Sequence, residues 1–284
     1  MADLPARCDL RELRGEVDEL LAGSDSLTLE SAEFAVARDY GFASWTRLES
    51  EVERRRLLDA CDVPALRTLL AEHPELAVER LEHWCDHPRG ATPLGYVAML
   101  RFDAARLGLS AVTRTADVAR TLISAGARVE GDSGDSETPL ITAASYGDAD
   151  VARVLVEAGA EIDARATENG AIPGGSALLH AAVFGFTDVV DLLAASGARI
   201  DGVVEAAAVG NIDGLLTDET PDEQKVRALT MAAGHDRVAV IEQLLVAGTP
   251  VDAVDAWGYT ALRAATENGR DAAVAALLAA GARS

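Results

Sequence analysis

The sequence is poor in aromatic residues and in cysteine. Only 12 of its 284 residues are Phe, Trp or Tyr, which favours small side chains between closely packed helices over a large globular core. The three cysteines, Cys8, Cys61 and Cys85, are odd in number and far apart in the chain. This usage argues against a disulfide framework and predicts a reducing compartment.

Basic residues are also scarce, because 25 Lys and Arg face 47 Asp and Glu and give a net charge of −22. A surface with this charge repels phosphate groups, so we expect neither nucleic acid nor an anionic membrane as a partner. The chain has no apolar run of membrane-spanning length and does not open with a basic segment followed by an apolar one. We therefore expect a soluble, cytoplasmic protein.

What the chain does contain is a recurring pattern of small apolar residues and glycine turns. The segment 176–201, SALLHAAVFGFTDVVDLLAASGARID, indicates a helix, a glycine turn and a second helix. Related segments start at Thr138, Ala228 and Thr260, and weaker ones start at Leu57 and Thr92. Repetition at such intervals predicts stacked supersecondary units rather than separate globular domains.

These segments resemble ankyrin repeats, whose pattern is a T-P-L-H-x-A-A helix, a glycine turn, a V-x-x-L-L helix and a closing G-A. The resemblance implies an all-α solenoid of about seven helix-turn-helix units. Residues 37–45, ARDYGFASW, resemble a segment that precedes such repeats in many bacterial proteins. We expect a helical N-terminal cap over residues 1–55 and the repeats over residues 56–284, with an insertion at about 102–114.

The alignment of the units predicts where the turn before each second helix lies, namely at Gly147, Gly185, Gly210, Asp236 and Gly269. The step from Gly185 to Gly210 leaves no room for a projecting hairpin. The step before it contains a long glycine-rich connection, residues 166–175. We therefore expect an irregular stack.

In ankyrin-like stacks the residues just before each turn line a concave face. Most of these positions are apolar or aromatic here, which predicts a hydrophobic groove with a polar C-terminal end. The alternative is that these side chains pack on one another as ordinary core. The predicted groove residues before a turn are Met99, Tyr146, Phe184 and His235. Tyr96 and Met231, at the helix position where ankyrin repeats usually have leucine, are predicted to line the same groove.

His180 and Glu205 occupy equivalent positions in adjacent units, so we expect them to be neighbours. A carboxylate beside an imidazole raises the basicity of the ring and fixes its tautomer, as a general base requires. Under this interpretation His180 is the catalytic acid or base and Glu205 orients it. The alternative is a buried structural hydrogen bond, because such pairs also occur without catalysis.

Two predicted hairpin tips carry further contact residues. Residues 83–90, HWCDHPRG, include Trp84, Asp86 and His87, and the last unit carries Trp257 and Tyr259. Exposed aromatic tips are favoured anchors for a protein partner. The His-x-Cys-x-His spacing in the first tip lacks a second pair of ligands, so we expect no metal and no cofactor.

Two functions remain open at this point. The resemblance implies a scaffold that binds a protein partner through its concave face and hairpin tips, and the acidic exterior would attract a basic partner. The alternative is a central pocket for an apolar small molecule, with proton-transfer chemistry such as isomerisation, cyclisation or hydrolysis. The sequence contains no nucleophile elbow and no phosphate-binding glycine loop.

Overall fold

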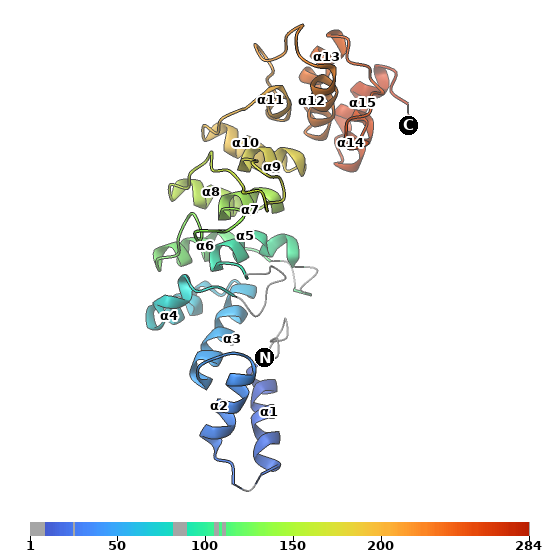
Figure 1. The fold of residues 1–284 in the computed structure, drawn as a ribbon. Helices are drawn as coiled ribbons and strands as arrows, with labels where there is room; N and C mark the ends of the chain where they lie inside the picture. Colours follow the sequence, from blue (N-terminus) through green and yellow to red (C-terminus); the bar gives the residue numbers. More distant parts are fainter. Residues whose placement is uncertain (1–8, 25, 82–89, 105–107, 110–111, 284) are drawn as a thin grey trace. The chain divides into compact units, whose positions relative to one another are not determined.

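The computed structural model describes residues 9–24, 26–81, 90–104, 108–109 and 112–283. These residues form fifteen α-helices, one 3-10 helix and two isolated β-bridges, and they contain no strand (Figure 1). The all-α prediction is therefore confirmed. None of the helices in the described ranges is long and apolar enough to cross a membrane. The chain divides into two compact units, unit 1 (residues 1–133) and unit 2 (residues 134–284).

In unit 1, consecutive helices pack against one another, except that α4 and α5 both pack against α6. The elements are α1 (Leu10–Ala22), α2 (Leu29–Asp39), α3 (Trp45–Asp59), α4 (Val63–Glu72), η1 (Pro74–Ala77), α5 (Pro93–Asp103) and α6 (Thr115–Ser124). The predicted second helix that begins at Thr115 is therefore present as α6.

The N-terminal helix-turn-helix predicted around residues 37–45 is also present. Helix α2 ends at Asp39, Gly41 adopts a positive φ of 87°, and the Ser44 hydroxyl accepts a hydrogen bond from the Arg47 N–H at the start of α3. The predicted boundary after residue 55 falls inside α3, which contacts both α2 and α4. No linker separates a cap from the first repeat at that point.

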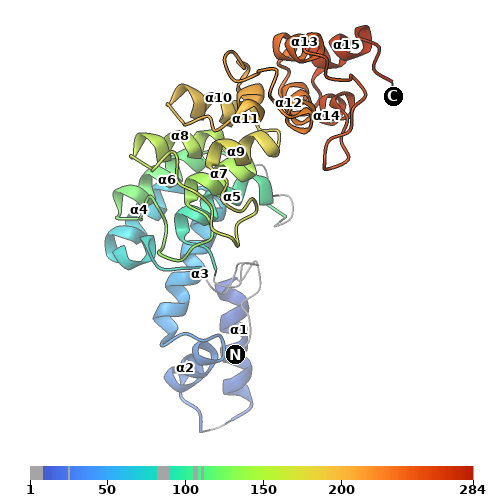
Figure 2. The same cartoon turned by 45° about the horizontal axis from the view of Figure 1, so that its top comes forward.

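Unit 2 consists of short helix pairs in which the inner helices α7, α9, α11, α12 and α14 contact one another in order (Figure 2). The elements are α7 (Pro139–Tyr146), α8 (Ala149–Glu157), α9 (Ala177–Val183), α10 (Thr187–Ala195), α11 (Val203–Val209), α12 (Asp222–Gly234), α13 (Val238–Val246), α14 (Ala261–Glu267) and α15 (Asp271–Ala279). Fully buried alanines fill the core between them, including Ala143, Ala181, Ala206, Ala232 and Ala265.

The repeated Thr or Ser at the start of each motif is a helix cap. The side chains of Thr138, Ser176 and Thr260 each accept a hydrogen bond from the backbone N–H three residues later. Each cap satisfies a donor that the first helical turn leaves without a partner. The motif can therefore be read from the sequence because it encodes a local start signal.

The glycine turns also follow from the sequence, and Gly147 shows why glycine is needed. Its φ is 73°, in the left-handed region that other residues rarely adopt. A Cβ atom at Gly147 would lie 2.3 Å from the Phe186 ring, which packs there from the next unit. Both the turn and the close approach of the neighbouring unit require glycine.

One predicted element is wrong, because no second helix follows Gly210. Residues 211–221 contain no helix, and the next one, α12, is the inner helix of the following unit. The segment NIDGLLTDETP lacks a helical apolar period, and a turn forms instead, in which the Thr220 hydroxyl accepts from the Thr217 N–H. Ile212 is the one apolar residue of this segment that is buried. The repeat that contains α11 therefore has only one helix.

Candidate binding surface

Four of the predicted groove residues are buried, so the prediction that they line an open groove is wrong for them. The exposed fractions are 2% for Tyr96, 5% for Met99, 5% for Met231 and 1% for His235. A side chain at one of these repeat positions gives the same sequence pattern whether it packs inward or faces solvent. At these positions the alternative interpretation holds, and the side chains belong to the core.

Tyr96 shows what such a buried position does. Its hydroxyl donates a hydrogen bond to the Asp59 carboxylate at 2.5 Å, and the Arg55 guanidinium lies over its ring, 4.3 Å from the centroid. Arg55 in turn forms an ion pair with Asp59. The phenol therefore ties α5 to α3 within unit 1 rather than facing a partner.

His235 lies in the turn after α12 and joins two neighbouring repeats within unit 2. Its Nε2 donates to the Ala182 carbonyl at 2.8 Å, and its Nδ1 lies 2.9 Å from the Thr187 hydroxyl. Donation from Nε2 leaves Nδ1 as an acceptor in the neutral ring. Burial lowers the pKa of His235 to about 4, and the nearby Arg237 and Arg270 act in the same direction. His235 is thus neutral and has a structural role, because it links two neighbouring repeats.

His180 and Glu205 do not form the expected pair. The His180 side chain is completely buried; its Nδ1 lies 2.8 Å from the Ser176 carbonyl and its Nε2 lies 3.6 Å from the Glu137 carboxylate. Glu205 instead accepts a hydrogen bond from the Asp201 N–H at 2.5 Å. The carboxylate beside the imidazole is Glu137, which lies before α7 and is not in the equivalent repeat position.

The position of Glu205 has a local explanation. Helix α11 starts after Gly202, which has no side chain to cap it, and Glu205 in the first turn reaches back to the Asp201 N–H, one residue before the cap. Burial raises the pKa of Glu205, while the hydrogen bond from Asp201 opposes that shift. Glu205 therefore stabilises a helix start.

His180 supports the glycine-rich connection 166–175. A Cβ atom at Gly175 would lie 2.8 Å from the His180 ring, so the loop closes over the imidazole only because a glycine is there. The Glu137 carboxylate accepts a hydrogen bond from the Ala171 N–H at 2.7 Å in the same loop. The loop covers the ring and leaves it no exposed surface.

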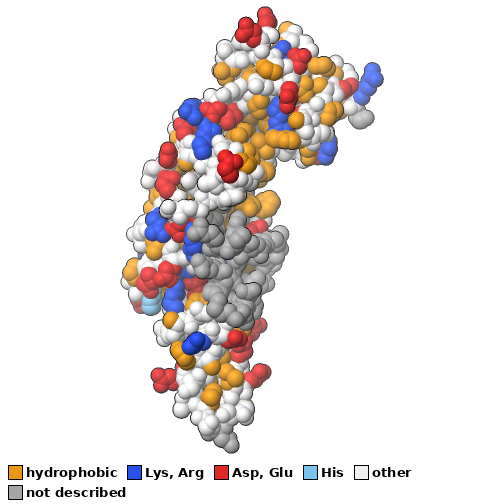
Figure 3. Space-filling model, viewed as in Figure 1, with side chains coloured by type: hydrophobic (Ala, Val, Ile, Leu, Met, Phe, Trp, Pro, Cys, Tyr) orange, Lys and Arg blue, Asp and Glu red, His pale blue; other side chains and the backbone are white. Residues whose placement is uncertain are grey.

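Other predicted contact residues do reach the surface of unit 2. Phe184 is 43% exposed and Trp257 is 58% exposed, while Tyr146 and Tyr259 are half-buried. Figure 3 shows hydrophobic side chains gathered on the face of unit 2 where α9, α12 and α14 lie. The predicted contact residues Trp84, Asp86 and His87 lie outside the described residues.

The tip that carries Trp257 and Tyr259 is a tight turn organised by one carboxylate. Asp255 Oδ1 accepts hydrogen bonds from the N–H groups of Trp257 and Tyr259, each at 3.0 Å. The Asp255 N–H donates to the Tyr259 carbonyl at 2.9 Å, and Val254 and Thr260 form a β-bridge below it. Residues 254–260, called the 254–260 tip below, are thus held by several bonds although they project from the unit.

Two arginines fix the aromatic rings of the tip. Arg227 on α12 donates to Asp255 Oδ2 at 2.7 Å and places its guanidinium over the Trp257 ring. Arg263 on α14 places its guanidinium 4.2 Å from the centroid of the Tyr259 ring. Burial lowers the pKa of Arg227, but an arginine side chain stays protonated in proteins. A guanidinium group therefore packs against each of the two rings.

Sequence reasoning found the two aromatic residues of the tip but missed Arg227, Asp255 and the exposed Val254. An Asp ahead of a glycine turn is a usable signal, because its side chain often bonds the backbone two residues on. Arg227 gave no signal, since it lies on α12, 28 residues before Asp255.

Comparisons with known proteins agree with the repeat pattern. Residues 107–204, about a third of the chain, match the family model of ankyrin repeats in three copies. Ankyrin repeats are therefore present, and the helices that surround the matched region give an all-α fold of the ankyrin-solenoid type. No curated protein matches the chain.

Among solved structures, the human ASB11 ankyrin repeat domain is similar to this chain. The identity is 21%, the match covers 81% of this chain and 97% of that one, and the TM-score is 0.46. A similarity of this size supports no conclusion about function.

Proposed function

We propose that this protein is a non-catalytic interaction scaffold and that unit 2 binds a protein partner through the 254–260 tip. The observation that carries the proposal is Trp257, which is 58% exposed and yet fixed by Arg227 and the Asp255 turn. An exposed aromatic ring that is already ordered loses little conformational entropy on binding, and Trp is enriched among residues that dominate interfaces.

The neighbouring side chains extend the same contact. Val254 is 59% exposed and Tyr259 is half-buried against Arg263. Together with Trp257 they form an apolar patch with cationic groups behind it. Phe184 and Tyr146 are further proposed contact residues on unit 2, since both have accessible rings.

The charge of unit 2 favours a basic partner. Residues 134–284 contain 23 acidic and 9 basic residues, so this unit alone carries a net charge of −14. A field of this sign speeds the approach of a cationic protein and slows that of an acidic one. We expect the association rate to fall as the salt concentration rises, because salt screens this attraction.

Proton-transfer chemistry by His180 and Glu205 receives no support from the geometry. A general base must reach the proton that it removes, and the His180 ring is completely buried. Glu205 is engaged in capping α11. Binding of an apolar small molecule remains the alternative that the experiment has to distinguish.

The test compares wild-type protein with Trp257→Ala. Each is incubated with lysate of the host, recovered, and weighed intact by native mass spectrometry. We expect wild type to retain a partner of protein mass and Trp257→Ala to lose it, while the melting temperature stays the same because the ring is exposed. Val246→Ala is the matched control, since Val246 is 90% exposed on α13 and lies outside the tip.

The opposite result is equally clear. An adduct of small-molecule mass that survives in Trp257→Ala would reject the scaffold and favour a pocket elsewhere. A protein partner that Trp257→Ala retains as strongly as the control would keep the scaffold and reject the tip as its docking site.

A further inference from the structure

Unit 2 contains the pentapeptide ATENG twice, at residues 166–170 and at residues 265–269. Each copy places an asparagine directly before a glycine, Asn169 in the first copy and Asn268 in the second. The first copy lies in the glycine-rich connection 166–175, whereas the second lies at the end of α14. Because the two sequences are identical, a difference in the chemistry of the two asparagines must come from the fold.

An asparagine that precedes a glycine can undergo a reaction with its own backbone. The glycine nitrogen attacks the side-chain Cγ of the asparagine and forms a C–N bond, and the amide nitrogen leaves as ammonia with the proton of the glycine N–H. Water then opens the five-membered succinimide ring to aspartate or to isoaspartate. Glycine favours this reaction because no side chain shields its nitrogen, and the rate depends on how freely the two groups reach the right geometry.

Asn268 is fixed in position by three features. It is the C-cap of α14, and its backbone N–H donates to the Ala264 carbonyl at 3.2 Å. Its side-chain Nδ2 donates to the same carbonyl at 2.9 Å. Its Oδ1 packs against the turn at Gly185, where a Cβ atom would lie 2.5 Å from it. The backbone and the amide of Asn268 are therefore both restrained.

Asn169 lacks these restraints. It lies outside any helix, and its backbone N–H makes a long contact of 3.4 Å with the Thr167 hydroxyl. Among the described residues, its side-chain amide has no hydrogen-bond partner. In both copies the asparagine is exposed and the glycine N–H donates to the threonine carbonyl, at 3.0 Å and 3.1 Å. What differs is therefore the restraint on the asparagine itself.

The glycine after Asn169 is required by the packing of the connection. A Cβ atom on Gly170 would lie 2.7 Å from the Ala166 Cβ atom and 3.3 Å from the Glu137 carboxylate. A larger residue does not fit there unless the connection shifts. The fold therefore demands, directly after Asn169, the residue that leaves this asparagine most open to attack.

We propose that Asn169 is a site of spontaneous, one-way conversion to aspartate and isoaspartate in the folded protein, and that Asn268 is protected. The proposal is independent of the 254–260 tip and of any partner. Both products replace a neutral amide by a carboxylate, so the connection gains a negative charge beside Glu168.

Isoaspartate also changes the length of the main chain, because the chain then runs through the former side chain and gains one carbon atom. The connection is held by the Ala171 N–H, which donates to the Glu137 carboxylate at 2.7 Å. Gly170, which precedes this donor, is packed tightly against Ala166. The longer chain does not fit while this bond and this contact are both kept. We therefore expect the connection to open over the His180 ring after the conversion.

The test follows both asparagines in one sample. Full-length protein is kept at mildly alkaline pH and digested with trypsin at intervals, which places Asn169 in peptide 166–199 and Asn268 in peptide 264–270. Mass spectrometry measures the exchange of amide for hydroxyl, and isoaspartyl methyltransferase labels the isoaspartate. We expect Asn169 to convert roughly tenfold faster than Asn268, because the amide of Asn268 must first leave its hydrogen bond and its packed position.

Three controls isolate the effect of the fold. In guanidinium chloride the restraints are absent, and the two identical pentapeptides should convert at nearly equal rates. Asn211, in peptide 200–225, precedes Ile212 and should convert more slowly than Asn169 in both conditions, because a branched side chain shields the attacking nitrogen. Hydrogen exchange in the connection should become faster as wild-type protein ages, but not in Asn169→Gln, whose longer side chain forms the ring less readily.

Two results would overturn the proposal. In the first, Asn268 converts as fast as Asn169 in the folded protein, so the restraints have no effect. In the second, neither asparagine converts in the folded protein while both convert in guanidinium chloride, so the turn at residues 167–170 protects Asn169 as well. Conversion of Asn169 without faster hydrogen exchange would keep the site and reject the opening of the connection.

Discussion

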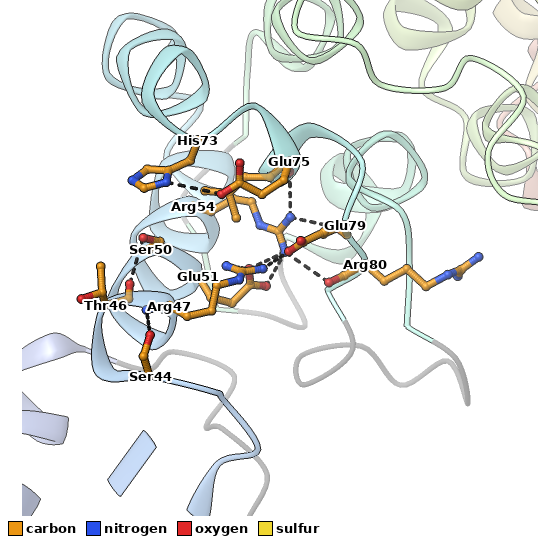
Figure 4. A network of polar contacts seen from close by, with 11 residues as sticks. Ser44, Thr46, Arg47, Ser50, Glu51, Arg54, His73, Glu75, Glu79 and Arg80 are labelled. Atoms are coloured by element: carbon orange, nitrogen blue, oxygen red, sulfur yellow. Dashed lines mark hydrogen bonds and ion pairs between the residues drawn. The ribbon is translucent and has the colours of Figure 1, made fainter. Parts of the chain in front are cut away.

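Side chains that donate hydrogen bonds to backbone carbonyl groups join helices in both units, but the two units arrange them differently. In unit 1, Arg54 on α3 is completely buried. It donates hydrogen bonds to the carbonyl groups of Leu76 and Glu79, both at 2.7 Å, and of Arg80 at 3.2 Å. Glu51 lies 2.5 Å away as its counter-ion (Figure 4). One guanidinium thus holds three carbonyls in and after η1.

In unit 2 the same task is divided among successive turns. Arg270 donates to the Gly234 carbonyl at 2.9 Å and to the Gly185 carbonyl at 3.1 Å. Arg237 donates to the Ala208 carbonyl at 2.8 Å, and His235 donates to the Ala182 carbonyl. The two arginines remain partly exposed. Each of these side chains therefore binds fewer carbonyl groups than Arg54 does.

Both arrangements answer the same need. The last turn of a helix leaves carbonyl groups without partners, and its dipole favours a positive charge there. Unit 1 meets this need with a deeply buried ion pair, for which loss of one partner is costly. Unit 2 meets it with repeated bonds at the turns, so each can be removed at a lower cost. Three substitutions test this contrast.

The largest effect should come from Arg54→Met. It removes the donor from one buried and two part-buried carbonyls and, among the described residues, leaves Glu51 with only the Arg47 guanidinium, 3.6 Å away, as a counter-ion. Breaking a buried ion pair in this way costs about 3–5 kcal/mol. Chemical denaturation should show the loss, and hydrogen exchange should locate it in α3 and η1. The matched control is Arg56→Met, because Arg56 lies on the same helix, is 58% exposed and pairs with Glu53. It should cost about 1 kcal/mol or less.

The double variant Arg54→Met/Glu51→Leu sharpens the interpretation. If the buried charge on Glu51 causes the damage, removing it together with Arg54 should recover part of the stability. No recovery would mean that the carbonyl hydrogen bonds dominate. If Arg54→Met lowers the free energy of unfolding no more than Arg56→Met does, the buried Arg54 does not hold α3 and η1 together.

The second effect is a pH dependence that comes from His235. Burial lowers its pKa to about 4 from an unfolded value near 6.5, so the unfolded chain binds the proton first as the pH falls. This contribution to stability is fully present above about pH 6.5 and is lost as the pH falls towards 4. The full shift corresponds to on the order of 3 kcal/mol.

Stability measured at pH 7.5 and at pH 5 should therefore differ less in His235→Gln than in wild type. Glutamine can still donate to the Ala182 carbonyl but does not titrate. His73→Gln is the control, because His73 is partly exposed in unit 1 and its Nδ1 lies 3.4 Å from the Glu75 carboxylate. An unchanged pH dependence in His235→Gln would assign the acid sensitivity to other groups.

Local features of the fold could be predicted from the sequence, whereas the hydrogen bonds from side chains to distant carbonyl groups could not. Capping by Thr138 and the turn at Gly147 depend on residues a few positions apart, so a single segment contains the whole signal. The bond from Arg270 to Gly185 joins residues 85 positions apart. Nothing near either residue indicates the other. The missing helix after Gly210 escaped notice because the turn itself is normal.

The residues of the candidate site also fall into two groups, those that could be predicted from the sequence and those that could not. Trp257 and Tyr259 could be predicted because a hairpin tip faces solvent by its position in the repeat. The burial of Met99 and Met231 could not, because it depends on neighbouring helices. The same holds for His180, whose carboxylate neighbour, Glu137, lies 43 positions earlier in the chain.

The smallest of the three effects should come from Arg270→Ala. Three partly buried hydrogen bonds are lost, to Gly234, Gly185 and the Thr187 hydroxyl, but water can reach the freed groups and His235 still links the same turns. We expect a loss of about 1–2 kcal/mol, with faster hydrogen exchange around residues 185–187 and 234–236. Arg263→Ala, which removes an exposed ion pair with Glu267 on the preceding helix, should cost less than Arg270→Ala. If Arg270→Ala proved as damaging as Arg54→Met, the turns of unit 2 would act as one cooperative joint, because removing a single bonded side chain would then release the others as well.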